Sequence, residues 1–63
     1  MCLSTAYEVS GGSEKFIADR ITNVVVEGNT VRLTTLLGTQ TVVTGELKSI
    51  DLNKNIILID GKN

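Results

Sequence analysis

The chain has 63 residues, the length of one small domain, so we expect a single domain over residues 1–63. Six basic and seven acidic residues give a net charge of −1, which argues against a nucleic-acid partner because phosphate binding needs a basic excess. No apolar run approaches the roughly 20 residues that span a bilayer, and no signal peptide is recognisable, so we expect a cytoplasmic protein without a membrane segment.

Alternating and β-branched residues predict strands in the first half of the chain. Residues 1–9 alternate weakly, which places Cys2 near the start of a strand. A flexible turn at Ser10–Ser13 follows, and 14–20 are expected to be extended or irregular because seven residues make a poor isolated helix. Three successive valines then predict a strand over 21–27.

The clearest hairpin signal lies in the middle of the sequence. Gly28-Asn29 supplies two residues that tolerate positive φ, as tight hairpin turns require. A returning strand is expected over 30–37, with Val26 beside Val31 as a cross-strand aliphatic pair.

The second half continues the same pattern of short strands and turns. A bulge or sharp bend is expected at Gly45, because glycine interrupts a strand pattern there. The other expected elements are a turn at 38–39, strands over 40–44, 46–52 and 56–59, and a turn at 53–55. Five or six short strands with regular turns indicate an all-β barrel or meander. Barrel closure would remove exposed edges, and an edge left open would be a natural dimerisation surface.

The amino terminus carries the most distinctive donor atoms of the chain. Cys2 is the single cysteine, there is no histidine, and its thiol lies one residue from the Met1 amine. The amine, the Cys2 amide nitrogen and the thiolate can form two adjacent chelate rings, a donor set that suits Ni(II) and Cu(II). A fourth donor would come from water, another backbone group or a second chain. The alternatives are a cysteine that only packs as a small hydrophobe, and removal of Met1 by an aminopeptidase.

Other residue combinations would suit an RNA-binding barrel, but they are a weaker signal than the donor atoms at the amino terminus. Tyr7 and Phe16 can stack on bases, and Arg32 and Lys48 can contact phosphate. Two aromatic residues are more often part of a core, however, and scattered basic residues usually form a solvated surface.

An enzyme is not expected. Without histidine, Ser4, Thr5 and Ser10 lack an evident general base. Glu46 and Asp51 offer carboxylates to a metal, but their expected role is solubility.

Three segments resemble the CooT family of nickel-binding accessory proteins for carbon monoxide dehydrogenase maturation. They are Met1-Cys2-Leu3, the segment Val26–Leu36 (VEGNTVRLTTL) and the segment Gly45–Leu52 (GELKSIDL). The resemblance implies a small Sm-like or SH3-like β barrel of five to seven short antiparallel strands. It also implies a homodimer that binds Ni(II) through Cys2, with the Met1 amine as a plausible co-ligand. The dehydrogenase or its other accessory proteins would be partners. The family's Sm-like shape keeps a small RNA-binding protein as the alternative, by analogy of fold alone.

Overall fold

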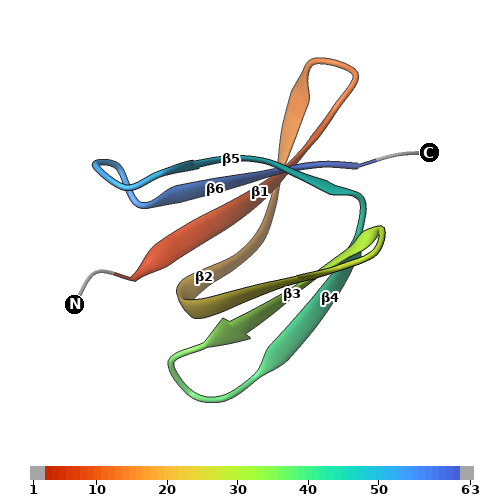
Figure 1. Cartoon of the computed structure of the whole chain (residues 1–63). Coiled ribbons are helices and arrows are strands. Elements are labelled where there is room, and N and C mark those ends of the chain that lie inside the picture. Colours follow the sequence, from red (N-terminus) through yellow and green to blue (C-terminus); the bar gives the residue numbers. More distant parts are fainter. Residues whose placement is uncertain (1–2, 62–63) are drawn as a thin grey trace.

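The computed structural model describes residues 3–61, which form one six-stranded sheet (Figure 1). These residues include no helix, and hence none that could cross a membrane. The strands are β1 (Ser4–Ser10), β2 (Ser13–Glu27), β3 (Thr30–Thr35), β4 (Gln40–Thr44), β5 (Glu46–Asp51) and β6 (Ile56–Asp60). The predicted all-β class is therefore confirmed.

The sheet has the strand order β4-β3-β2-β1-β6-β5 and curls into a half-barrel. All neighbouring strands are antiparallel except β1 and β6, which pair in parallel over five residues from Thr5↔Ile56 to Val9↔Asp60. The first and last strands are thus neighbours inside the sheet, with residues 3 and 61 at opposite ends of the pair, while β4 and β5 form the edges of the sheet. At the far end of β1, the Gly61 N–H donates to the Val9 carbonyl at 3.0 Å and extends this pairing.

Strand β2 is a single long strand that bends in its middle. It contains both residues 14–20, which were expected to be extended or irregular, and the predicted valine strand over 21–27. The first half of β2 pairs with β1, and the second half pairs with β3. Arg20 lies at the junction with φ at 53°, a value that non-glycine residues rarely adopt. The Arg20 carbonyl accepts a hydrogen bond from the Leu36 N–H at 2.8 Å, which holds the bend. The bend lets one strand serve both halves of the curled sheet.

The predicted hairpin is confirmed, including its register. Val26 lies opposite Val31, and Gly28 has φ at 57°. Asn29 is not among the residues with positive φ, so only the first central residue of this turn uses the left-handed region.

The bend predicted at Gly45 forms the corner between β4 and β5. Gly45 has φ at 152° and is buried. A Cβ atom there would overlap the Asp60 carbonyl oxygen on β6, so the close approach of the two backbones requires glycine.

The core is one cluster of buried side chains. Its buried side chains come from β1, β2, β3 and β6 and are all aliphatic. They are Ala6, Ile21, Val31, Leu33, Ile57 and Ile59. No polar or charged side chain among residues 3–61 is buried, so hydrophobic burial supplies the main stabilisation of the fold.

Candidate functional site at the amino-terminal end of the sheet

Both predicted ligand residues, Met1 and Cys2, lie outside the described residues. The structure shows what holds the chain immediately after them. Strand β1 begins at Ser4, which lies opposite Ile21 of β2. On the other side, the Thr5 N–H donates to the Asn55 carbonyl at 2.9 Å. Because β1 lies between two hydrogen-bonded neighbours, the segment after Cys2 is anchored in the middle of the sheet.

Two turns lie at the same end of the sheet as the start of β1 (Figure 1). The β3–β4 turn is attached there by the hydrogen bond from Leu36 to the Arg20 carbonyl, and the β5–β6 turn by the bond from Thr5 to Asn55. The turns carry three exposed leucines, Leu36, Leu37 and Leu52, with exposed fractions of 57%, 77% and 80%. We call this region the amino-terminal end of the sheet. It comprises Leu3, Arg20, the β3–β4 turn and the β5–β6 turn.

Three charged side chains near this end, those of Asp19, Arg20 and Asp51, have partners within the chain. Asp19 and Arg20 form an ion pair of 3.7 Å between two exposed side chains. One carboxylate oxygen of Asp51 accepts hydrogen bonds from the N–H groups of Asn53 and Lys54, both at 3.0 Å. Asp51 thus caps the β5–β6 turn.

Metal-binding side chains do not cluster within the described part of the chain. Glu46 and Asp51 lie at opposite ends of β5, so the structure does not bring these two carboxylates together. No group of three or more cysteine, histidine, aspartate or glutamate residues that could hold a metal occurs within 3–61, nor is there a pocket.

Asn55 helps to anchor the start of β1, a role that could not be recognised from the sequence. Its φ is 58°, in the left-handed region, and its carbonyl accepts the Thr5 N–H. Asparagine tolerates this conformation better than most residues. The turn Asn53-Lys54-Asn55 was recognisable, but the hydrogen bond to β1 depends on the parallel pairing of distant strands.

Replacing Asn55 with valine is expected to destabilise the fold by about 1–2 kcal/mol, because a β-branched residue is strained at positive φ. Asn55→Gly is the matched control and should be close to neutral, since glycine adopts this φ without strain. Urea denaturation followed by circular dichroism measures both variants. Equal stability of the valine and glycine variants would contradict the role of this backbone conformation.

The aromatic residues considered for RNA binding contact each other. Tyr7 of β1 and Phe16 of β2 are register partners, with ring centroids 6.2 Å apart and an interplanar angle of 79°. The Phe16 side chain is 58% exposed, whereas Tyr7 is half-buried. The pair contributes an edge-to-face contact on the sheet surface.

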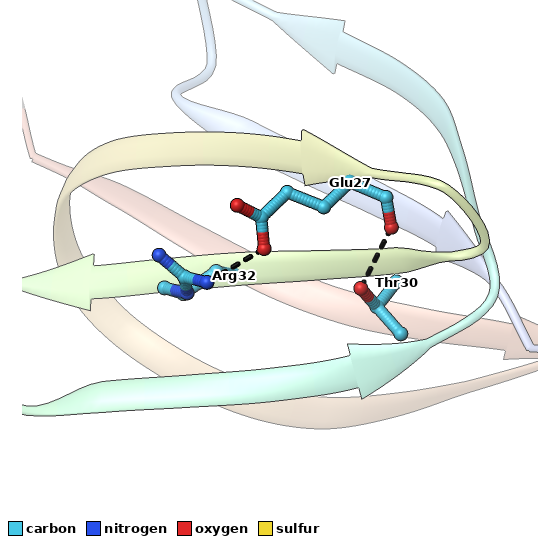
Figure 2. Close-up of polar contacts among 3 residues, drawn as sticks. All are labelled: Glu27, Thr30 and Arg32. Atoms are coloured by element: carbon cyan, nitrogen blue, oxygen red, sulfur yellow. Dashed lines mark hydrogen bonds and ion pairs between the residues drawn. The ribbon is translucent and has the colours of Figure 1, made fainter.

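Arg32, the other candidate RNA contact, is engaged in an ion pair. Figure 2 shows its guanidinium donating to the Glu27 carboxylate at 2.6 Å, while the Thr30 hydroxyl donates to the Glu27 carbonyl at 2.8 Å. Arg32 lies opposite Val25, which is on the other side of the β2 bend from Phe16. The structure therefore does not bring Arg32 together with the aromatic pair.

We expect Glu27→Gln to lower the free energy of unfolding by less than about 1 kcal/mol, because exposed ion pairs contribute little. Thermal or urea denaturation at low and high salt measures the effect. A loss of several kcal/mol would show that this pair is a major structural contact.

Comparison with known proteins bears on the whole chain. A family model described as "CO dehydrogenase accessory protein CooT" matches residues 1–60. A crystal structure of a protein assigned as CooT, from Carboxydothermus hydrogenoformans, superposes with a TM-score of 0.87 at 21% identity. That match covers 98% of this chain and 100% of the other, and it confirms the fold. No relative was found among curated proteins. The family match spans nearly all of the sequence, and the chain belongs to the CooT family of CO dehydrogenase accessory proteins.

Proposed function

We propose that this protein is a Ni(II)-binding accessory protein that holds or delivers nickel during maturation of carbon monoxide dehydrogenase. The observation that carries the proposal is the family match over residues 1–60, which includes Met1 and Cys2. An accessory role in the dehydrogenase system follows from the family. The proposal adds nickel as the cargo, Cys2 as the principal ligand and the cytoplasm, where thiols stay reduced, as the location.

The donor chemistry of the terminus supports nickel as the cargo. The Cys2 thiolate, the Cys2 amide nitrogen and the Met1 amine would give one nitrogen–sulfur chelate of the kind that tetragonal Ni(II) accepts. Three donors leave a fourth position for water, a backbone group or a second chain. We propose a homodimer, because a partner subunit can supply that donor and also stabilise so small a domain.

The anchoring of β1 supports a terminal site. Its hydrogen bonds on both sides fix the chain from Ser4 onward. Only Leu3 separates this fixed strand from Cys2. The ordering of a short terminal segment costs less conformational entropy than the ordering of a long flexible tail.

An activation assay tests the proposed role. Nickel-free carbon monoxide dehydrogenase would be incubated with the nickel-loaded protein, with the Cys2→Ser variant given the same nickel, or with free Ni(II) at the same total concentration. We expect faster activation by the wild-type protein in the presence of a competing chelator. Activation no faster than with the Cys2→Ser variant would refute delivery through Cys2.

Blocking the amino group tests the role of Met1. If the amine is a ligand, acetylation of the terminus should weaken nickel binding by at least about tenfold, since one of three donors is lost. Isothermal titration of the acetylated and free proteins measures the change. Unchanged affinity would instead indicate that thiolates carry the ion without the amine.

A further inference from the structure

The two aromatic residues of the chain lie outside its core. Tyr7 and Phe16 are the only aromatic residues in the sequence, and the buried cluster is entirely aliphatic. Tyr7 follows the buried Ala6, and successive side chains of a strand point to opposite faces of the sheet. The ring pair therefore lies on the face opposite the core, where Phe16 is 58% exposed. Aromatic side chains are enriched in protein interfaces, so this exposed pair is a candidate for binding.

Two adjacent rows of residues make up this surface. Each row crosses β2, β1 and β6, and the rows lie two residues apart in each strand, so their side chains share a face. The apolar row consists of Phe16, Tyr7 and Leu58. The acidic row consists of Glu14, Val9 and Asp60. We call these six residues the outer face.

The acidic row gives the outer face a negative charge. Glu14 and Asp60 are exposed, and neither takes part in an ion pair among residues 3–61. Glu46 lies opposite Asp60 on β5 and adds a third carboxylate beside the row. Lys15 follows Glu14 in β2, but it lies opposite Glu8 and hence on the other face of the sheet. The outer face therefore combines an apolar row with carboxylates along one side of it.

We propose that the outer face binds a protein segment that carries lysine or arginine beside aliphatic side chains. The aliphatic side chains would cover the exposed ring of Phe16, and the basic side chains would pair with Glu14 and Asp60. A cationic group is also attracted to the face of an aromatic ring. Complementary potentials of this kind set the choice of partner and speed up the encounter.

The charge of the outer face favours a basic protein over other occupants. Nucleic acids and anionic lipids have the same sign of charge as Glu14 and Asp60 and would be repelled. A second copy of this chain laid face to face would bring carboxylates toward carboxylates, and opposed like charges are unfavourable at an interface. A basic segment meets the carboxylates and the apolar row at once.

The inference goes beyond the proposed function and does not rest on nickel. Val9 lies six residues after Leu3, which is about 20 Å along an extended strand. The acidic row is thus at the opposite end of β1 from the amino-terminal end of the sheet. A second subunit that supplies a donor beside Cys2 would leave this row uncovered.

The test is a nuclear magnetic resonance titration of the metal-free, ¹⁵N-labelled protein with a synthetic amphipathic peptide. The peptide has leucines on one side, flanked by lysines, and the control peptide has glutamates in place of the lysines. We expect a dissociation constant on the order of 10–100 μM at low ionic strength, and at least about tenfold weaker binding of the control peptide. The amide shifts should concentrate in the two rows of the outer face, and added salt should weaken the binding.

Matched variants separate the outer face from net charge and from general hydrophobicity. Glu14→Lys should weaken binding of the lysine peptide at least about fivefold, whereas Asp19→Lys, with the same change in net charge at another exposed position, should change it less than about twofold. Phe16→Ser should also weaken binding, and Val42→Ser, at a side chain that is 61% exposed on β4, should not. Circular dichroism checks that all four variants fold.

Three results would overturn the inference. The first is peptide-induced shifts that lie mainly outside the outer face. The second is equal affinity for the lysine and glutamate peptides. The third is a loss of affinity in Asp19→Lys as large as in Glu14→Lys, because net charge alone would then explain the binding.

Discussion

Replacing Gly45 with valine is expected to leave most of the protein unfolded at room temperature. Gly45 is buried at the corner between β4 and β5, with φ at 152°. An added Cβ would overlap the Asp60 carbonyl oxygen and lie 3.2 Å from the carbonyl carbon. The Asp60 carbonyl oxygen and carbon are backbone atoms of β6, which is paired with both β1 and β5. They cannot move aside as a flexible side chain would. A domain of this size has a total stability of only about 3–9 kcal/mol, and the strain removes a large share of it.

Gly28→Ala provides the matched control for this prediction. Gly28 also has positive φ, at 57°, but a Cβ there meets no atom within 4 Å. The alanine variant should therefore lose only about 1 kcal/mol from backbone strain. Far-UV circular dichroism with urea denaturation compares the two. A valine at 45 that folds as stably as the alanine at 28 would show that the corner can relax.

Leu33→Ala is expected to cost about 2–5 kcal/mol, the range for large-to-small changes in a packed core. Leu33 is fully buried at the centre of β3, and its strand contributes Val31 to the same cluster. With no disulfide available from one cysteine, the chain has few other means of compensating for a cavity. We expect a lower urea midpoint with an unchanged slope, since the surface exposed on unfolding stays nearly the same.

Leu37→Ala is the control, because the same substitution at a side chain that is 77% exposed creates no cavity. Its stability should stay within about 0.5 kcal/mol of the wild type. If both leucine variants lost similar stability, the assignment of Leu33 to the core and of Leu37 to the surface would be wrong.

The local features of the fold could be predicted from the sequence because neighbouring residues determine them. The Gly28 turn sets the register of Val26 against Val31, and the valine run favours a strand. The bend at Gly45 was also recognisable, because glycine in an aliphatic strand pattern signals a bulge or close approach.

Contacts between distant segments could not be read in the same way. The parallel pairing of β1 with β6 joins residues about fifty positions apart, and nothing in either strand specifies the direction of its partner. The left-handed conformation of Arg20 is imposed by the curled sheet rather than by the residue type. For the candidate site, the sequence predicted Met1 and Cys2 as ligands, and this stays a prediction because both lie outside the described residues. The anchoring of the next strand through Asn55 emerged only from the fold.

The most direct test of nickel binding through Cys2 is a spectroscopic titration. Ni(II) would be added to the reduced wild-type protein and to Cys2→Ser, with Ser4→Ala as a control that alters a neighbouring hydroxyl and keeps the thiol. We predict a saturable thiolate-to-nickel absorption band for the wild type and Ser4→Ala, and no such band for Cys2→Ser together with at least about a hundredfold loss of affinity. Equal nickel affinity of the wild type and Cys2→Ser would contradict the account.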